Sequence, residues 1–415
     1  MREEQTAVGI DQVGLYMPRY VLSLDALAAV RGVPAEKIHI GLGAYKMAIA
    51  APWEDAVTLG ANAAARLFAQ GQVSPDEIGL LLVATETAVD HAKPASIFLH
   101  EMLGIPSNCR TFELKHACYG GTAGVMIAAD WIRSGAARGR KALVVATDIA
   151  RYPVGSSAEF TQGAGAVALV VSAQPRLLAL DPLSGVFARN VYDFWRPLDR
   201  REALVDGKFS VECYLDALDG AVADYRAARN GRGSADGASI HTRLAALLYH
   251  TPFPKMAYKA HLRLLQGECR RTGNRPADLA AEAERSYAAQ VEPWLEAARV
   301  VGNTYTASLY LCLAWLAERA AVRFEGERIG LFSYGSGCCA EFFTGQFVSG
   351  APRAASCIGM ADLLAARREL TVDEYEAFAH GGACGGTPPG EDAGFCHLAA
   401  VRDDKRIYER GGLSV

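Results

Sequence analysis

Two apolar runs constrain the fold of this chain more than any other feature. One runs from residue 78 to Glu86, and the other runs from residue 141 to Asp148. Runs that do not alternate with polar residues predict strands buried on both faces, as in a sheet covered by helices. The alanine-rich, amphipathic stretch 54–70 predicts one of these helices. Strand and helix alternate through roughly the first 170 residues, which predicts an α/β fold with a mixed or parallel sheet.

The length and composition exclude several classes of protein. With 415 residues, 51% apolar and 21% charged, the chain can bury a core without metals or disulfides, as two domains or one large duplicated one. A formal net charge of -4 argues against nucleic acid as a partner. The chain lacks both an apolar run of roughly 18 residues and a signal-type N-terminus, so we expect a cytoplasmic protein without a membrane span. Its ten cysteines are then expected to be free thiols, and the lack of a Cys-x-x-Cys pair argues against a metal site.

The stretch around Cys118 reads as the end of a strand, a sharp bend and the start of a helix. A cysteine at a helix N-terminus faces unpaired backbone N–H groups and the positive end of the helix dipole, which favour the thiolate. Gly120 and Gly121 leave room for a substrate to approach the backbone closely. Taken alone, the stretch fits a reactive cysteine or a buried structural one.

Glu86 follows the first apolar run directly. A carboxylate at the mouth of a buried strand is desolvated, which raises its pKa and suits it to acid/base work. A solvated glutamate at a strand end is an equally good interpretation of this segment alone.

The part of the chain from Val211 onward repeats the pattern of the first part. The apolar run 244–249 ends at His250, as the earlier run ends at Glu86. The helix predicted after Pro254 carries Lys255 and Lys259 on one face of its first two turns, where they oppose the dipole unless they meet an anion. Two solvated lysines remain the alternative. A duplicated fold follows from this repetition, although direct identity between the halves is slight.

Further polar groups lie at the predicted ends of strands or starts of helices, where an open sheet places its active site. The strand predicted at 329–335 ends in a turn at Ser336, whose backbone N–H groups suit an oxyanion. Asn303 precedes a long helix predicted at 307–321, and the aromatic and polar cluster 192–197 resembles a pocket wall. Open sheets place active sites at strand ends, and a thiolate with a carboxylic acid and a histidine suggests acyl transfer through a thioester followed by a carbon-forming step.

Six motifs in one order identify a family. Together they closely resemble 3-hydroxy-3-methylglutaryl-CoA (HMG-CoA) synthase, of the thiolase fold, over about residues 8 to 350. The motifs are Thr85-Glu86-Thr87-x-x-Asp90, Ala117-Cys118-Tyr-Gly-Gly-Thr, Asp148-Ile-Ala-x-Tyr152, His250-Thr-Pro-Phe, Gly302-Asn303-x-Tyr-Thr-Ala-Ser and Phe332-Ser-Tyr-Gly-Ser-Gly337.

The resemblance implies a thiolase-like α/β fold, with two duplicated halves in a five-layer αβαβα core, and a homodimer. Residues 1–172 would form the half with the nucleophilic cysteine and the glutamate. Residues 173–415 would form the half with the histidine and the asparagine, plus a C-terminal extension.

The resemblance also implies a role for each site residue. Cys118 would take an acetyl group from acetyl-CoA, Glu86 would act as general base and acid, and His250 would position acetoacetyl-CoA. The N–H groups of Cys118 and Ser336 would form the oxyanion hole. The remaining residues match family contacts to the thioester, to the CoA phosphates or to the other site groups: Asn303, Lys255, Lys259, Asp148, Tyr152 and Asp193.

The implied reaction joins acetyl-CoA and acetoacetyl-CoA to give HMG-CoA and CoA, in the mevalonate pathway to isoprenoid precursors, with no cofactor beyond the CoA thioesters. The alternative is the branch of the family that acts on acyl-carrier-protein thioesters in polyketide biosynthesis, which Cys338-Cys339 and 374–376 resemble. His116 stands where relatives usually have a different polar residue.

Two further alternatives are less consistent with the residues present. An initiating ketoacyl synthase shares the fold and uses Cys, His and Asn, but has no need of a carboxylate such as Glu86. A non-catalytic acyl-binding or thiol-sensing protein would be favoured by the loss of a principal residue, and Cys118, Glu86 and His250 are all present.

Overall fold

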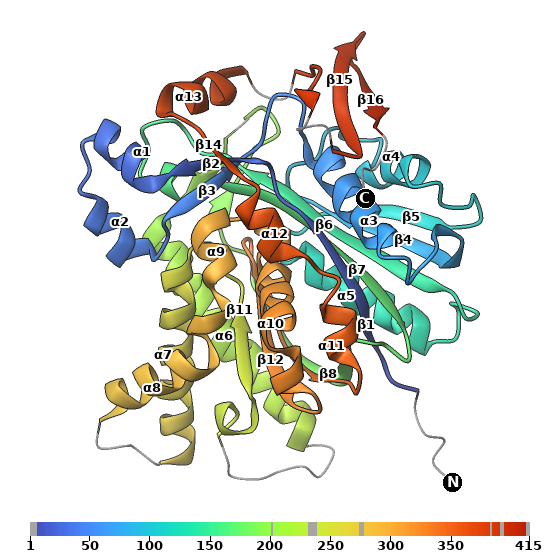
Figure 1. The fold of residues 1–415 in the computed structure, drawn as a ribbon. Helices are drawn as coiled ribbons and strands as arrows, with labels where there is room; N and C mark the ends of the chain where they lie inside the picture. The colour runs from blue at the N-terminus through green and yellow to red at the C-terminus, as the bar shows by residue number, and fades with distance from the viewer. Residues whose placement is uncertain are drawn as a thin grey trace.

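One large sheet runs through the molecule in the computed structural model, which describes residues 6–200, 202–230, 239–273, 278–381, 384–390 and 394–411. Nine strands of the described chain lie side by side in this sheet (Figure 1), in the order β11 (Ala246–Tyr249), β12 (Arg328–Gly335), β13 (Cys339–Phe347), β8 (Leu178–Ala188), β1 (Val8–Tyr16), β7 (Gly163–Ala173), β6 (Lys141–Ala150), β4 (Ile78–Ala84) and β5 (Arg110–Leu114).

The sheet consists of two parts with the same topology. The order β1-β7-β6-β4 in the first part corresponds to β8-β13-β12-β11 in the second. In both, the first three strands pair antiparallel and the last two pair parallel. The parts join where β1 pairs with β8. The predicted fold class, with two duplicated halves, is therefore confirmed. The division into residues 1–172 and 173–415 stays a prediction, because one sheet continues through both parts.

Helices cover this sheet in layers, and the side-chain alternation of its strands assigns each face to a layer. In β4, Leu81 and Val83 share a core cluster with helices α3 (Ala56–Ala69) and α4 (Ala95–Met102). Leu80 and Leu82 point to the other face and share a second cluster with α5 (Gly120–Arg133) and α10 (Ser308–Phe324). Helix α6 (Gly207–Asn230) covers β8 and β13 of the second part and contacts α7 (Pro254–Thr272).

Smaller elements surround this core. They comprise the strands β2 (Tyr20–Ser23), β3 (Lys46–Ile49), β9 (Phe194–Trp195), β10 (Leu204–Val205), β14 (Arg368–Glu369), β15 (Cys396–Arg402) and β16 (Lys405–Arg410), and the helices α1 (Leu24–Arg31), α2 (Ala35–Leu42), α8 (Leu279–Gln290), α9 (Glu296–Val301), α11 (Ala351–Ala355), α12 (Met360–Ala365) and α13 (Val372–Gly381). Figure 1 shows the C-terminal hairpin β15–β16 beside α3 and α4. Arg406 and Tyr408 of this hairpin bond the Asp55 carboxylate, which caps α3. None of the helices described is long and apolar enough to cross a membrane.

Candidate active site

Cys118 lies in the bend between β5 and α5, as its sequence context predicts. The residue before it, Ala117, has a φ of 40°, a left-handed conformation that is uncommon for alanine and recurs at functional sites. The Cys118 Sγ donates a hydrogen bond to the Glu86 Oε1 at 3.1 Å. Burial, followed by the neighbouring Glu86 carboxyl, raises the pKa of Cys118 well above its ordinary value. Burial and the Glu86 carboxyl thus favour the thiol form of Cys118, in the direction opposite to the effect predicted for the helix N-terminus.

The glycines after Cys118 serve a different purpose from the predicted one. A Cβ on Gly121 would lie 2.5 Å from the backbone oxygen of Thr306, and one on Gly120 would lie 3.3 Å from the Thr306 side chain. These glycines therefore admit the other part of the molecule to close contact with α5, and the space beside them is filled by protein and not by substrate.

Glu86 follows β4 and has the raised pKa that the sequence predicts. Burial, with a smaller contribution from the Asp148 charge, raises the pKa of Glu86 to about 8. The hydrogen bond from Cys118 and the positive charge of Arg196 oppose this shift. A carboxyl with a pKa near the working pH can accept a proton and return it, as a general base and acid must.

Asp148 holds the loop that carries Glu86. It lies inside β6, opposite Gly165, and not at the end of the strand as predicted. Its Oδ1 accepts the backbone N–H of Glu86 at 2.9 Å and the Thr87 hydroxyl at 2.7 Å. Its Oδ2 accepts the backbone N–H of Thr306 at 3.1 Å. One buried carboxylate thus ties the Glu86 loop to the second part of the molecule.

Several predicted site residues border one cavity of about 260 Å³, which we call the cysteine cavity. The predicted residues that line it are Cys118, Tyr152, His250, Asn303 and Ser336. Aromatic side chains complete much of the wall, namely Phe194, Phe253, Tyr305 and Tyr334. A mainly apolar wall with a few converging polar groups is typical of a small-molecule site. The sequence-based interpretation of the cluster 192–197 as a pocket wall is confirmed for Phe194.

His250 occupies the position after β11 that Glu86 occupies after β4. Burial lowers the pKa of His250 to about 3, so the imidazole is neutral at physiological pH. Its Nδ1 lies 2.7 Å from the Ser308 hydroxyl at the start of α10, and the Tyr214 ring stacks beside it. A neutral imidazole fixed in this way can hydrogen-bond a substrate but carries no charge to it.

Asn303 and Tyr152 meet at the same cavity. The Asn303 Oδ1 accepts the backbone N–H of Tyr305 at 2.9 Å, and Tyr305 has a φ of 44°. A Cβ on Gly163 would lie 2.7 Å from the Asn303 backbone, so this contact between the two parts requires glycine. Burial raises the pKa of Tyr152, which therefore stays neutral.

Asp193 fixes the turn that bears Ser336. It accepts the backbone N–H of Gly337 at 2.9 Å and the Tyr334 hydroxyl at 2.5 Å. The preceding Gly335 packs against the cysteine bend, where an added Cβ would lie 2.6 Å from both the His116 oxygen and the Tyr119 nitrogen. Ser336 and Cys118 are thereby held at one cavity, as a shared oxyanion hole would require.

Lys255 and Lys259 lie in the first two turns of α7, as predicted, but neither lines the cysteine cavity. Their Nζ atoms lie 4.7 Å from the Tyr258 ring centre and 5.8 Å from the Phe253 ring centre, respectively. Because Phe253 lines the cavity and Lys259 is exposed, these lysines lie outside the cavity and beside its wall. Their contact with CoA phosphates stays a prediction.

Three residues near the reacting groups were not singled out from the sequence. Tyr305 and Tyr334 line the cavity, and Arg196 donates a hydrogen bond to the backbone oxygen of Glu86. Both tyrosines lie inside the motifs that identified Asn303 and Ser336, so the same motifs could have predicted them as site residues. Arg196 belongs to the cluster 192–197 that the sequence analysis interpreted as a pocket wall, but its contact with Glu86 depends on the folded chain and has no local sequence signal.

The comparisons with known proteins agree with this geometry. The profile described as hydroxymethylglutaryl-coenzyme A synthase N terminal matches residues 4–175, and the C-terminal profile matches residues 178–286 and 274–380. A hydroxymethylglutaryl-CoA synthase of Enterococcus faecalis is 40% identical over 370 residues, covering 89% of this chain and 91% of the relative. A polyketide biosynthesis 3-hydroxy-3-methylglutaryl-ACP synthase of Bacillus subtilis is 33% identical over 390 residues, covering 90% and 88%.

Solved structures give the same result. MvaS in complex with 3-hydroxy-3-methylglutaryl coenzyme A superposes with a TM-score of 0.94 at 44% identity, covering 98% of this chain and all (100%) of that one. The HMG synthase of the curacin pathway, in complex with an acetyl donor-ACP, superposes with a TM-score of 0.86 at 32% identity, with the same coverage. The chain therefore belongs to the hydroxymethylglutaryl-CoA synthase family of condensing enzymes with the thiolase-like fold.

Proposed function

We propose that this protein condenses acetyl-CoA with acetoacetyl-CoA, through an acetyl group on Cys118, to give HMG-CoA and CoA for isoprenoid precursors. The observation that carries the proposal is the 3.1 Å contact between the Cys118 Sγ and the Glu86 Oε1, beside a cavity that His250 also lines. A nucleophile next to a general base meets the requirement of acyl transfer followed by carbon–carbon bond formation.

In the first step the Cys118 sulfur attacks the carbonyl of acetyl-CoA and the carbon–sulfur bond to CoA breaks. The proton of the Cys118 thiol passes to the CoA sulfur, so CoA leaves as its thiol. The backbone N–H groups of Cys118 and Ser336 stabilise the oxyanion. This step leaves the acetyl group on sulfur, beside the Glu86 carboxyl.

In the second step the Glu86 carboxylate removes a proton from the acetyl methyl group. The resulting carbanion adds to the ketone of acetoacetyl-CoA, which His250 and Asn303 orient, and Glu86 returns the proton to the new alkoxide. A pKa near 8 serves both directions of this transfer. In the third step water cleaves the thioester to Cys118 and releases HMG-CoA. No cofactor is needed beyond the two thioesters.

CoA is favoured over an acyl carrier protein as the carrier, because the relatives at 40% and 44% identity are a hydroxymethylglutaryl-CoA synthase and MvaS with HMG-CoA. The relatives with carrier-protein names are 32–33% identical. Lys255 and Lys259, beside the cavity wall, supply cations for CoA phosphates. We also propose a homodimer, since β5 is an edge strand of the sheet among the described residues, and an edge strand can pair with a strand of a second copy.

The test supplies acetyl-CoA and acetoacetyl-CoA to the purified protein without any carrier protein. Formation of HMG-CoA supports the proposal. If product forms only when both acyl groups are presented on carrier proteins, the enzyme belongs to the polyketide branch.

A further inference from the structure

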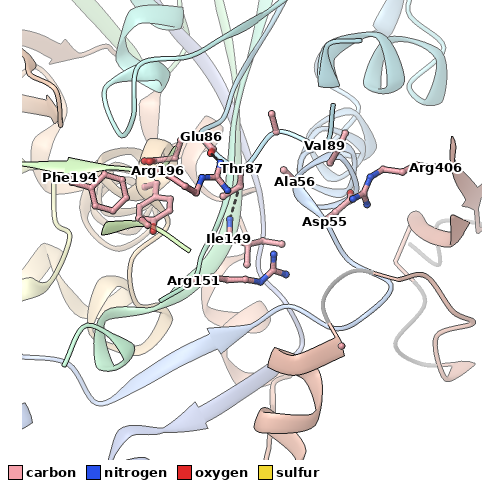
Figure 2. Close-up of a pocket in the computed structure, with 14 residues that line it drawn as sticks. Asp55, Ala56, Glu86, Thr87, Val89, Ile149, Arg151, Phe194, Arg196 and Arg406 are labelled. Atoms are coloured by element: carbon pink, nitrogen blue, oxygen red, sulfur yellow. Dashed lines mark hydrogen bonds and ion pairs between the residues drawn. The ribbon is translucent and has the colours of Figure 1, made fainter. Parts of the chain in front are cut away.

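A second cavity of about 300 Å³ borders Glu86, which does not line the cysteine cavity. Figure 2 shows Glu86, Arg196 and Phe194 on one side of it, and Asp55 with Arg406 on the other. Because three arginines line it, we call it the arginine cavity; they are Arg151, Arg196 and Arg406.

The two cavities are neighbours, because two residues line both of them. Phe194 and Tyr305 line both of them, while Cys118 lines the cysteine cavity and Glu86 lines the arginine cavity. The hydrogen bond from Cys118 to Glu86 therefore crosses from one cavity to the other. Glu86 is partly buried and lines the arginine cavity, as expected for a side chain that faces such a space.

The arginine cavity has its own opening to solvent. Ala88, Arg196 and Gly381 line it and are exposed at the surface. Its polar lining suits water, and its volume holds several water molecules, at about 30 Å³ each. The cysteine cavity differs, because its wall is mostly apolar and it is the space that the acyl chain and its carrier arm must fill.

The third chemical step consumes water at the moment when the cysteine cavity is full. The condensed product is then attached to Cys118 at one end and to its carrier at the other. A water molecule that entered past this chain would have to displace it, whereas a water in the arginine cavity reaches Glu86 directly.

We propose that the arginine cavity supplies the hydrolytic water while the cysteine cavity is occupied. This inference rests on the proposed function. Glu86 accepts one proton of the water as its oxygen bonds to the thioester carbon. The carbon–sulfur bond then breaks, and Glu86 returns the proton to the Cys118 sulfur. The new carboxylic acid then ionises, and its proton passes to solvent.

The test fills the arginine cavity and follows the steps separately. Val89→Phe and Ala203→Leu each enlarge a side chain that lines it and that has no proposed catalytic part. Ala379→Leu is the matched control, because Ala379 lines a neighbouring cavity of about 330 Å³ that Glu86 does not border. Each protein is acetylated and mixed with acetoacetyl-CoA, and the reaction is quenched at intervals. The mass of the intact protein in each sample is then measured by mass spectrometry.

The inference predicts normal acetylation and normal condensation in both filled variants, with hydrolysis slowed about tenfold or more. The covalent adduct of HMG-CoA on Cys118 then accumulates in these variants and not in the control. An adduct that clears as fast as in the control overturns the inference, and so does equal slowing of all three steps. If the unaltered protein forms no acetyl-enzyme from any thioester, the proposed function is wrong, and this inference, which rests on it, is wrong as well.

Discussion

The Cys118 Sγ lies 3.1 Å from the Glu86 Oε1, although 32 residues separate them in the sequence. This contact joins the nucleophile of one proposed step to the base of the next. Each group also affects the other, because the Glu86 charge raises the pKa of Cys118 while the thiol hydrogen bond lowers that of Glu86. Acetylation of Cys118 removes this hydrogen bond. The binding of the first acyl group therefore raises the pKa of Glu86, the base that acts in the next step.

The condensation step should depend on pH through Glu86. Burial raises its pKa to about 8, and the carboxylate is the form that removes the methyl proton. The rate of condensation by preformed acetyl-enzyme should therefore rise with pH and level off no lower than about pH 8, because acetyl-Cys118 no longer donates the hydrogen bond that lowers the pKa of Glu86. His250, with a pKa near 3, should add no limb between pH 5 and 7. A rapid-quench pH profile checks this, and a flat profile from pH 6 to 9 would assign the proton transfer to another group.

The same pKa predicts how stability changes with pH. The folded pKa of Glu86 lies above the free value of 4.5, so its contribution to stability is fully present below that value and is lost as pH rises to about 8. Glu86→Gln carries no titrating proton and should unfold at a higher temperature than the native protein at pH 8. Thermal melts at pH 5 and pH 8 measure this, with the gap between the two proteins widening at the higher pH. A gap independent of pH contradicts the assignment.

The lysines of α7 should affect substrate binding more than turnover. Replacing Lys255 or Lys259 by Ala should raise the KM for CoA substrates up to about fivefold each, since exposed ion pairs contribute about 0.2–1 kcal/mol. The kcat should change less, because a remote phosphate contact binds the ground state and the transition state alike. Lys405→Ala, an exposed lysine on β16, is the control. An unchanged KM in the double variant rejects the phosphate contact.

Gly335 should tolerate no side chain. A Cβ there would lie 2.6 Å from backbone atoms of His116 and Tyr119, so Gly335→Ala must displace the bend that carries Cys118. We expect a loss of roughly 1–3 kcal/mol in the free energy of unfolding, together with slower acetylation. Gly41→Ala in α2 is the matched control, since nothing lies within 4 Å of the added atom. Denaturant melts of both variants give the comparison, and equal stability would mean that the bend is more tolerant than its contacts indicate.

Sequence patterns predicted the fold where local rules and burial agree. The unbroken apolar run before Glu86 is β4, and its counterpart before His250 is β11 at the corresponding place in the second part. Such strands are predictable because burial on both faces leaves only apolar residues.

The predictions failed where the deciding contact comes from a distant part of the chain. The helix dipole at Cys118 favours a thiolate, but burial and the Glu86 charge act in the opposite direction. Gly121 looked open to substrate, yet Thr306 occupies that space. Asp148 looked like a strand end, but β6 continues for two more residues because β7 pairs with it. None of these neighbours is adjacent in the sequence, so no local pattern records them.

The most direct test of the account separates the two halves of the reaction in Glu86→Ala. Acetylation requires a thiol nucleophile and an oxyanion hole, whereas condensation requires removal of a proton from carbon. The variant should therefore accumulate one acetyl group on Cys118 from labelled acetyl-CoA, and Cys118→Ser should acquire none. Its formation of HMG-CoA should fall at least roughly 10²-fold, the lower end of what a general base contributes. A folded Glu86→Ala protein that makes product at a near-normal rate would contradict the central claim that Glu86 moves the proton.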